Sequence, residues 1–285
     1  MAPEIVFPNL GITINHLSRV CFTIFNMPVY WYGVIMTASI LIGGYAAGRE
    51  AERTGLKKET AYDCLFFAVI AAIIVSRAYY VIFSWDSYRD NLMKIFALRE
   101  GGLAVYGSLI GGIAALIIFC RVKKINAPAL MDCMAIGFIL GQAIGRWGNF
   151  INREAFGGYT ENIFAMRYLR ETVSVIPAEL HDMIITVNGA EYIQVHPTFL
   201  YESLWNTAVF AILLAYRKKK KFEGEVVALY FLLYASGRVW IEGLRTDQLL
   251  IPGTGVAVSQ VLSAVLIAAS LCFLVYKRKG ERGKE

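Results

Sequence analysis

The sequence predicts an all-α polytopic integral membrane protein, and three observations support this fold class. Hydrophobic residues make up 57% of the 285 residues, and the mean hydropathy is +0.51, which is high for a soluble domain. Seven stretches are long and apolar enough to cross the hydrocarbon core of a bilayer, which takes about 20 residues of helix. Lys and Arg gather in alternate connections between these stretches, a pattern typical of membrane topology.

The predicted transmembrane helices form one integral membrane domain over residues 1–285, with spans at 29–48, 62–83, 101–120, 128–148, 197–216, 225–243 and 256–276. The segments after the first, third, fifth and seventh spans hold seventeen Lys and Arg residues. The N-terminal tail and the remaining connections hold eight, spread over a longer stretch of chain. The positive-inside rule therefore predicts an N-terminus outside the cell and a cytoplasmic C-terminus.

The segment 149–196, between the fourth and fifth spans, is too long for an ordinary connection. It contains alternating polar and apolar stretches such as IITVNGAEYIQVHP, with the Asn188-Gly189 pair that is typical of a tight hairpin turn. We expect this segment to form an extracytoplasmic loop or small head, which either receives a protein substrate or caps a site.

Composition also argues against several kinds of partner. The net charge of +6 comes from cations beside apolar stretches, so no nucleic-acid partner is expected. The five cysteines include no C-x-x-C pair, which argues against a disulfide framework and against a zinc site. The sequence contains no metal-ligand cluster and no nucleotide-binding loop, so we expect neither a metal nor an organic cofactor.

Three arginines, Arg77, Arg146 and Arg238, lie inside predicted spans. An arginine at bilayer depth costs from about 3 to more than 10 kcal/mol, so it usually faces a partner, a cavity or a substrate. Snorkelling and a structural ion pair are the simpler alternatives, and Arg238 with Glu242 has the i, i+4 spacing of such a pair. That pair would leave Arg77, Arg146 and Arg245 without a counter-charge, so the sequence predicts a surplus of cations.

Six of the spans carry polar side chains near their predicted outer ends. The guanidinium fork of arginine matches phosphate oxygens, and phosphates at the depth of the outer leaflet belong to lipid headgroups. We therefore predict a phospholipid headgroup site formed by Trp31, Tyr32, Arg77, Arg99, Glu100, Tyr106, Gln142, Arg146, Asn149, Asn152, His196, Tyr201, Glu202, Tyr234, Arg238, Glu242 and Arg245.

The glycines follow two patterns. One pattern repeats every four residues and is typical of close helix contact in membranes, at Gly107, Gly111, Gly137, Gly141 and Gly145. The other brackets polar residues at a helix end, where backbone could approach an anion, and comprises Gly145, Gly148, Gly157 and Gly158.

Five motifs now identify a known family. WYG lies in the first span, REGGLAVYGSLIGG in the third, GRWGNFINREAFG at the end of the fourth, HPTFLYES at the start of the fifth and GRVWIEGLR in the sixth. In this order, and over nearly the whole chain, they resemble the prolipoprotein diacylglyceryl transferases. The resemblance implies a multi-pass enzyme of the bacterial cytoplasmic (inner) membrane, with seven spans, an N-terminus outside and an active site facing the outer leaflet.

The resemblance also implies the reaction. Members transfer the diacylglyceryl group of phosphatidylglycerol, taken from the lipid bilayer, to the lipobox cysteine thiol in the signal peptide of a preprolipoprotein. A thioether forms and glycerol 1-phosphate leaves. Matched by motif, Arg146 and Arg238 resemble the essential arginines of the family, with supporting positions at Tyr32, Asn149, Glu154 and Glu242.

We accordingly assign catalytic roles to Arg146, Glu202, Arg238 and Glu242, and substrate-binding roles to Tyr32, Arg77, Tyr106, Gln142, Asn149, Asn152, Glu154, His196, Tyr201 and Arg245. Some members carry a histidine at the position of Tyr106. Because a phenol has a pKa of about 10, Tyr106 is expected to donate a hydrogen bond and not to act as the base. Glu154, Glu202, Glu242 and, more weakly, His196 stay open as the base.

A phospholipid transporter or flippase is the alternative from another function class, since intramembrane arginines and glycine-rich helices also line translocation pathways. A purely structural scaffold is the third option. The polar residues gather at one end of the spans and no inverted repeat is visible, which favours the enzyme.

Overall fold

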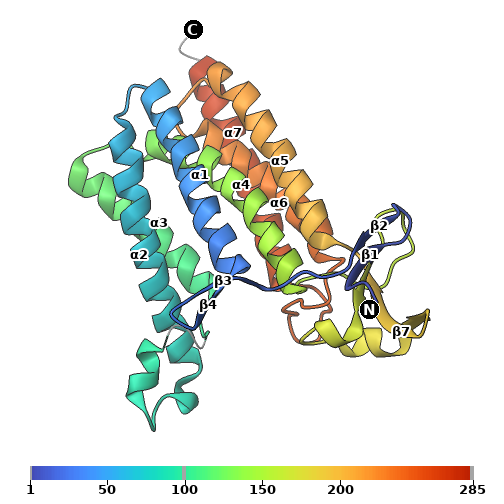
Figure 1. Ribbon diagram of the computed structural model, residues 1–285. Coiled ribbons are helices and arrows are strands. Elements are labelled where there is room, and N and C mark those ends of the chain that lie inside the picture. The colour runs from blue at the N-terminus through green and yellow to red at the C-terminus, as the bar shows by residue number, and fades with distance from the viewer. Residues whose placement is uncertain (1, 98–100, 283–285) are drawn as a thin grey trace. The chain divides into compact units, whose positions relative to one another are not determined.

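The computed structural model describes residues 2–97 and 101–282, and its ribbon is drawn in Figure 1. The chain divides into two compact units, one comprising Met1–Gly43 with Ala135–Glu285 and the other Gly44–Met134. Helices α1 (Trp31–Arg53) and α4 (Ala127–Asn152) each pass from one unit into the other. Arg99 and Glu100, which the sequence assigned to the site, lie outside the described residues.

The unit of residues 44–134 is built on two helices, α2 (Lys58–Phe83) and α3 (Val105–Lys123). The short 3-10 helices η1 (Trp85–Ser87) and η2 (Leu92–Phe96) lie between them in the chain. A Cβ on Gly107 would lie 2.6 Å from the Cα of Ser76, and one on Gly111 would lie 2.5 Å from the carbonyl oxygen of Ala71. The close contact predicted for these glycines is confirmed, because only glycine lets α2 and α3 approach this far.

The helices of the larger unit are the first part of α1, most of α4, α5 (Thr198–Tyr216), α6 (Glu225–Glu242) and α7 (Val258–Arg282). The 3-10 helix η6 (Arg217–Lys219) extends α5. Helices α4, α5 and α6 share a buried core that includes Ile139, Leu213 and Tyr230. A Cβ on Gly141 would lie 3.1 Å from the carbonyl oxygen of Ser39, so the glycine pattern of α4 also serves close contact, here with α1.

Six helices in the described part of the chain are long and apolar enough to cross a membrane, namely α1, α2, α3, α4, α5 with η6, and α7. Large apolar side chains such as Phe66 and Ile82 are exposed on them, as expected for surfaces that face lipid. The helix α6 is present where the sequence predicts it, but its 18 residues include Glu225, Arg238 and Glu242. A crossing by α6, and hence the count of seven spans, stays a prediction.

A five-stranded antiparallel sheet has the order β2-β1-β5-β7-β6, and it lies at the end of the larger unit where α4 ends and α5 begins (Figure 1). Its strands β5 (Met166–Leu169), β6 (Ile185–Val187) and β7 (Ala190–Val195) come from the segment 149–196. The predicted hairpin is confirmed, because β6 and β7 pair across Asn188 and Gly189, which both have positive φ, as a type I′ turn requires.

The N-terminal segment supplies the other strands, which the sequence analysis did not foresee. Strands β1 (Ile5–Phe7) and β2 (Ile12–Ile14) complete the sheet, and β1 pairs with β5 more than 150 residues away in the chain. A separate hairpin of β3 (Val20–Ile24) and β4 (Met27–Tyr30) leads into α1. The 3-10 helices η4 (Arg170–Thr172) and η5 (Ala178–Met183) connect β5 to β6.

The core of the sheet region fixes the ends of two site helices. Buried Tyr168, Met166 and Ile193 pack in one cluster with Phe150 at the end of α4 and Phe199 at the start of α5. The Phe150 and Phe199 rings lie 4.6 Å apart between centroids. Because both helices are held by the same core, the polar residues at their ends are held in a defined arrangement.

Candidate active site

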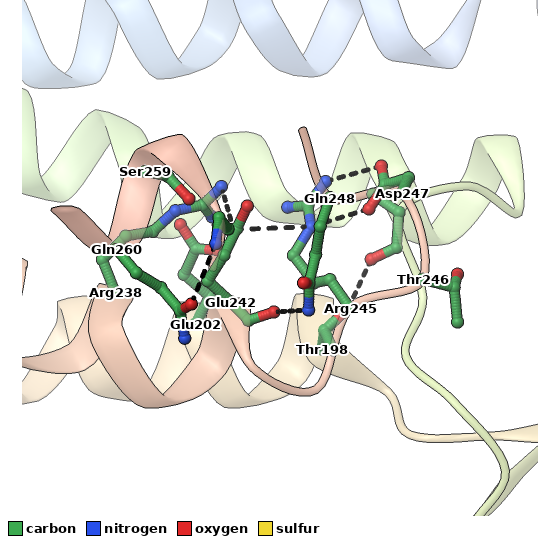
Figure 2. A network of polar contacts seen from close by, with 12 residues as sticks. Thr198, Glu202, Arg238, Glu242, Arg245, Thr246, Asp247, Gln248, Ser259 and Gln260 are labelled. Atoms are coloured by element: carbon green, nitrogen blue, oxygen red, sulfur yellow. Dashed lines mark hydrogen bonds and ion pairs between the residues drawn. The ribbon is translucent and has the colours of Figure 1, made fainter. Parts of the chain in front are cut away.

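Six charged side chains form one continuous series of ion pairs in the larger unit, which we call the ionic chain. Its members alternate in sign and come from α4, α5, α6 and the loop that follows α6, in the order Arg146, Glu202, Arg238, Glu242, Arg245 and Asp247. Figure 2 shows the part of it from Glu202 to Asp247.

Glu202 is the centre of the ionic chain. Its Oε1 lies 2.5 Å from Nη2 of Arg146, and its Oε2 accepts a hydrogen bond of 3.1 Å from Nη1 of Arg238. The Glu202 side chain is only 3% exposed, and each of its two carboxylate oxygens contacts a different guanidinium group. Two arginine forks from different helices therefore converge on one pair of oxygens.

The predicted i, i+4 pair on α6 is confirmed. Nη2 of Arg238 lies 2.5 Å from Oε2 of Glu242, and the Glu242 side chain is 6% exposed. The same Oε2 lies 3.9 Å from Nε of Arg245. Glu242 thus also lies between two arginines.

Asp247 forms the solvent-facing end of the ionic chain. Its two carboxylate oxygens accept hydrogen bonds of 2.9 and 2.7 Å from Nε and Nη2 of Arg245. Burial alone would raise the pKa of the Asp247 carboxyl, but the hydrogen bonds and charge of Arg245 outweigh it, so that pKa lies below its ordinary value. Asp247 is therefore ionised at neutral pH.

The predicted surplus of cations is wrong for this cluster. Arg146 is balanced by Glu202, and Arg245 by Asp247 together with Glu242. Spacing along one helix reveals an i, i+4 pair, but it does not reveal a carboxylate that a neighbouring helix or a following loop supplies. Asp247 was missed for this reason, although its position two residues after Arg245 was a usable signal.

A second polar group lies where α4 ends. Arg146 Nη1 donates a hydrogen bond of 3.4 Å to Asn149 Oδ1, and the amide of Asn149 donates one of 2.9 Å to Glu154. Asn152 donates to the same oxygen of Glu154 over 3.3 Å. Four predicted site residues are therefore linked in one hydrogen-bonded group that begins at the ionic chain.

Tyr32, in the first turn of α1, lies beside this part of α4. A Cβ on Gly148 would lie 2.9 Å from the Tyr32 ring. Gly148 therefore provides room for an aromatic ring, and not the backbone cradle for an anion that the sequence predicted.

Gln142 lies one turn before Arg146 and accepts a hydrogen bond of 3.2 Å from the hydroxyl of Tyr230. The Tyr230 ring stacks on that of Tyr234 with centroids 5.7 Å apart. Gln142 is thereby tied to α6, where Arg238 lies one turn beyond Tyr234.

His196 and Tyr201 form a separate group at the start of α5. The Asn162 amide donates a hydrogen bond of 2.9 Å to the Tyr201 hydroxyl, which lies 3.3 Å from Nδ1 of His196. Burial lowers the pKa of the His196 imidazole below its ordinary value, so the ring is neutral at pH 7. Asn162, in the head segment, was not predicted.

The backbone of Gly157 and Gly158 is occupied by protein partners, which corrects the prediction of an anion cradle there. The Gly157 N–H donates to the His196 carbonyl over 3.0 Å, and the Gly158 N–H donates to the Leu244 carbonyl over 2.9 Å. Gly157 also forms an isolated β-bridge with Arg245. These glycines hold the loop that carries Arg245 and Asp247 against the head.

Arg77 and Tyr106 belong to the unit of residues 44–134. Arg77 directs its guanidinium at the backbone carbonyls of Ile95, Gly101, Gly102, Lys94 and Ala97, at 2.6 to 3.5 Å, and lies over the Tyr88 ring. These contacts favour a role in holding residues 94–97 and 101–102, which precede α3 in the chain. The first turn of α3 carries the half-buried Tyr106. The substrate-binding roles of both residues stay predictions.

The arrangement joins cations, carboxylates and amides at the meeting point of α4, α5 and α6. Among residues 2–97 and 101–282, no group of three His, Cys, Asp or Glu side chains is placed to hold a metal ion. Charged groups and hydrogen-bond donors of this kind suit binding of an anionic group and stabilisation of a developing negative charge.

The amino-acid sequence is similar to that of a known protein family along most of its length. The prolipoprotein diacylglyceryl transferase family matches residues 19–276. The chain belongs to this family. The predicted family and its transferase class are thereby confirmed, and a transporter or flippase is not favoured.

Three relatives carry the name phosphatidylglycerol–prolipoprotein diacylglyceryl transferase. The protein of Bacillus cytotoxicus is 42% identical over 267 residues, which are 94% of this chain and 94% of that protein. The protein of Clostridioides difficile is 40% identical over 92% of this chain and 96% of its own length. That of Staphylococcus aureus strain Newman is 40% identical over 94% of this chain and 92% of its own length.

Proposed function

We propose that this protein transfers the diacylglyceryl group of phosphatidylglycerol to the lipobox cysteine thiol of preprolipoproteins. One observation carries the proposal beyond the names of the relatives. Arg146 and Arg238, from two different helices, hold the two oxygens of the Glu202 carboxylate. An oxyanion of a phosphate has the same charge and similar spacing of oxygens, so the two forks are suited to a lipid phosphate.

In the proposed reaction the thiolate sulfur attacks the glyceryl carbon that carries the phosphate. A carbon–sulfur bond forms, the carbon–oxygen bond to phosphate breaks, and glycerol 1-phosphate leaves with the bonding electron pair. Arg146 and Arg238 neutralise the charge that develops on the phosphate, which lowers the barrier in a site shielded from water. The substrate thiol is the nucleophile, so the chain needs no nucleophile of its own.

The thiol loses its proton to one of the predicted site residues, with Glu154, Glu202, Glu242 and His196 as candidates. A cysteine thiol has a pKa of about 8.5, and the arginines favour its thiolate form. Replacing each carboxylate by the amide and recording the pH–rate profile identifies the acceptor. A profile that is unchanged in every variant would support reaction of the thiolate without an assisting base.

We also propose the topology that this reaction requires. The N-terminus and the sheet lie outside the cytoplasm, α6 crosses the membrane as the seventh span, and the ionic chain faces the outer leaflet of the bacterial cytoplasmic membrane. The excess of Lys and Arg in alternate connections supports this orientation. Of the charged residues of α6, Arg238 and Glu242 belong to the ionic chain, and Glu225 lies in the first turn of the helix. This placement is compatible with a membrane-spanning helix that is surrounded by protein.

The test measures how much labelled diacylglyceryl group the purified protein transfers from phosphatidylglycerol to a lipobox peptide. Wild-type protein is compared with Arg146→Ala and with a peptide in which serine replaces the lipobox cysteine. Thioether product that disappears in both controls supports the reaction. Folded wild-type protein that gives no product would contradict the proposal, and lipid flipping in vesicles would then be measured.

A further inference from the structure

Asp247, the carboxylate at the end of the ionic chain, differs from the two inner carboxylates in its exposure and in its number of arginine partners. Glu202 and Glu242 are 3% and 6% exposed and each contacts two arginines. Asp247 is 48% exposed, lies in the loop after α6 and contacts one arginine, Arg245. Asp247 can therefore exchange its arginine for water at the lowest cost in free energy, because it has one partner and already lies beside solvent. Glu202 and Glu242 would each lose two arginine partners while staying buried.

The charge of the ionic chain makes such a departure necessary. Three arginines face three carboxylates, so the resting chain has no net charge. A phosphodiester brings one negative charge, and an uncompensated anion in a shielded site is strongly disfavoured. With Asp247 turned into solvent, three cations face two carboxylates, and the remaining charge of +1 matches one phosphodiester.

The backbone of Arg245 is held by contacts that do not involve the Asp247 carboxylate. The Arg245 N–H donates to the Glu242 carbonyl over 3.0 Å, and Arg245 also bridges to Gly157. The Gln248 amide donates to the same Glu242 carbonyl over 2.5 Å (Figure 2). These backbone contacts of Arg245 do not depend on its pairing with Asp247, and Glu242 Oε2 still lies 3.9 Å from its Nε.

We propose that Asp247, through its contact with Arg245, is an exchangeable counter-ion that competes with the lipid phosphate for the positive charge of the ionic chain. This inference rests on the proposed function. Binding of the lipid phosphodiester displaces the Asp247 carboxylate into water. After the carbon–oxygen bond breaks, the leaving group is a phosphate monoester with a charge of about −1.5 to −2 at pH 7. That charge exceeds the +1 of the opened chain, so the return of Asp247 to Arg245 promotes release of glycerol 1-phosphate.

The test measures the affinity of purified protein in detergent for glycerol 1-phosphate by calorimetry, together with kcat and KM for transfer. Asp247→Asn removes the competing charge, and the matched control Asp86→Asn removes an exposed carboxylate that pairs with Arg89 outside the ionic chain. We expect Asp247→Asn to bind glycerol 1-phosphate about tenfold more tightly, as for removal of a competing charge from one site. KM and kcat should both fall, while the rate of a single turnover is retained.

A merely structural role of Asp247 predicts the opposite sign, because a displaced Arg245 would bind the product anion less tightly. Equal or weaker affinity in Asp247→Asn, with Asp86→Asn unchanged, would overturn the proposal. Asp247→Ser gives a second reading if the asparagine variant does not fold. Failure of the proposed function is recognised separately, because wild-type protein would then make no thioether product, whatever its affinity for glycerol 1-phosphate.

Discussion

Nη2 of Arg146 on α4 lies 2.5 Å from Oε1 of Glu202 on α5, and this contact joins two helices through a pair of opposite charges whose carboxylate is buried. The second oxygen of Glu202 holds Arg238 of α6. One carboxylate therefore fixes the two arginines to which we assign the lipid phosphate. Helix packing alone would not place two guanidinium groups of like charge so close together, because they repel each other without the anion.

Arg146→Lys should reduce kcat/KM for diacylglyceryl transfer by at least about 100-fold, since lysine keeps the charge but loses the fork. In the resting protein that fork reaches both Glu202 and Asn149. Steady-state assays with labelled phosphatidylglycerol measure the effect. Arg170→Lys is the matched control, because Arg170 pairs with Glu191 on the surface of the head. A lysine variant with nearly wild-type turnover would rule out bidentate binding by Arg146.

Glu202→Gln should destabilise the protein by about 3–5 kcal/mol, the usual cost of breaking a buried ion pair on one side. The amide leaves Arg146 and Arg238 facing each other with no charge between them. Thermal unfolding in detergent, followed by circular dichroism, measures the loss. Glu191→Gln, which breaks a half-exposed pair, should have a small effect. If the two variants melt at the same temperature, the Glu202 carboxylate does not hold the three helices together.

Gly157→Ala should lower both thermal stability and transfer, whereas Gly158→Ala should change neither substantially. A Cβ on Gly157 would lie 2.5 Å from the Leu244 carbonyl oxygen and 2.8 Å from Cβ of His196. The clash displaces the loop that carries Arg245, because Gly157 bridges to that residue. A Cβ on Gly158 meets nothing within 4 Å.

The two adjacent glycines therefore form their own control, since the chemical change is the same and only the space differs. Melting temperatures and transfer rates of both alanine variants are compared with those of the wild type. Equal behaviour of the two variants would show that the close approach at Gly157 has no part in placing Arg245.

Glu4→Gln should lower the melting temperature at pH 7 and have a smaller effect in acid. Glu4 pairs with Arg153 and accepts hydrogen bonds from the Leu17 N–H and from His16. Burial raises the pKa of the Glu4 carboxyl, but these hydrogen bonds and the charge of Arg153 outweigh it and leave the pKa below its ordinary value.

The sign of the pH dependence follows from that lowered pKa. Ionised Glu4 contributes stability above its ordinary pKa, and this contribution is lost as the pH falls through the lower pKa of the folded protein. The gap in melting temperature between wild type and Glu4→Gln should therefore close toward acid pH. Glu171→Gln, which changes an exposed carboxylate in the segment between β5 and β6, is the control. A gap that persists undiminished in acid would mean that the charge of Glu4 is not the cause.

The sequence predicted the helices well because hydrophobic length is a local property of the chain. The predicted span 225–243 corresponds to α6 at Glu225–Glu242, and 197–216 to α5 at Thr198–Tyr216. The hairpin at Asn188 and Gly189 was also predictable, since a tight turn needs its residue types at adjacent positions. The motifs that identify the family are likewise read directly along the chain.

The sheet of the head was only partly predictable, because its strands are far apart in the chain. Strand β1 near residue 5 pairs with β5 near residue 168, and no local pattern relates the two segments. The alternation in IITVNGAEYIQV indicated strands in the head, but it did not indicate that the N-terminal segment completes the sheet.

The sequence by itself determined that the chain is a membrane protein, where its helices lie and to which family it belongs. The tertiary structure decided which charge faces which. Arg146, Glu202 and Arg238 are separated by 56 and 36 residues, yet they form one ionic group. The physical reason is that helix formation depends on neighbours within a few residues, whereas an ion pair depends on distances that only the packing of helices from distant parts of the chain can set.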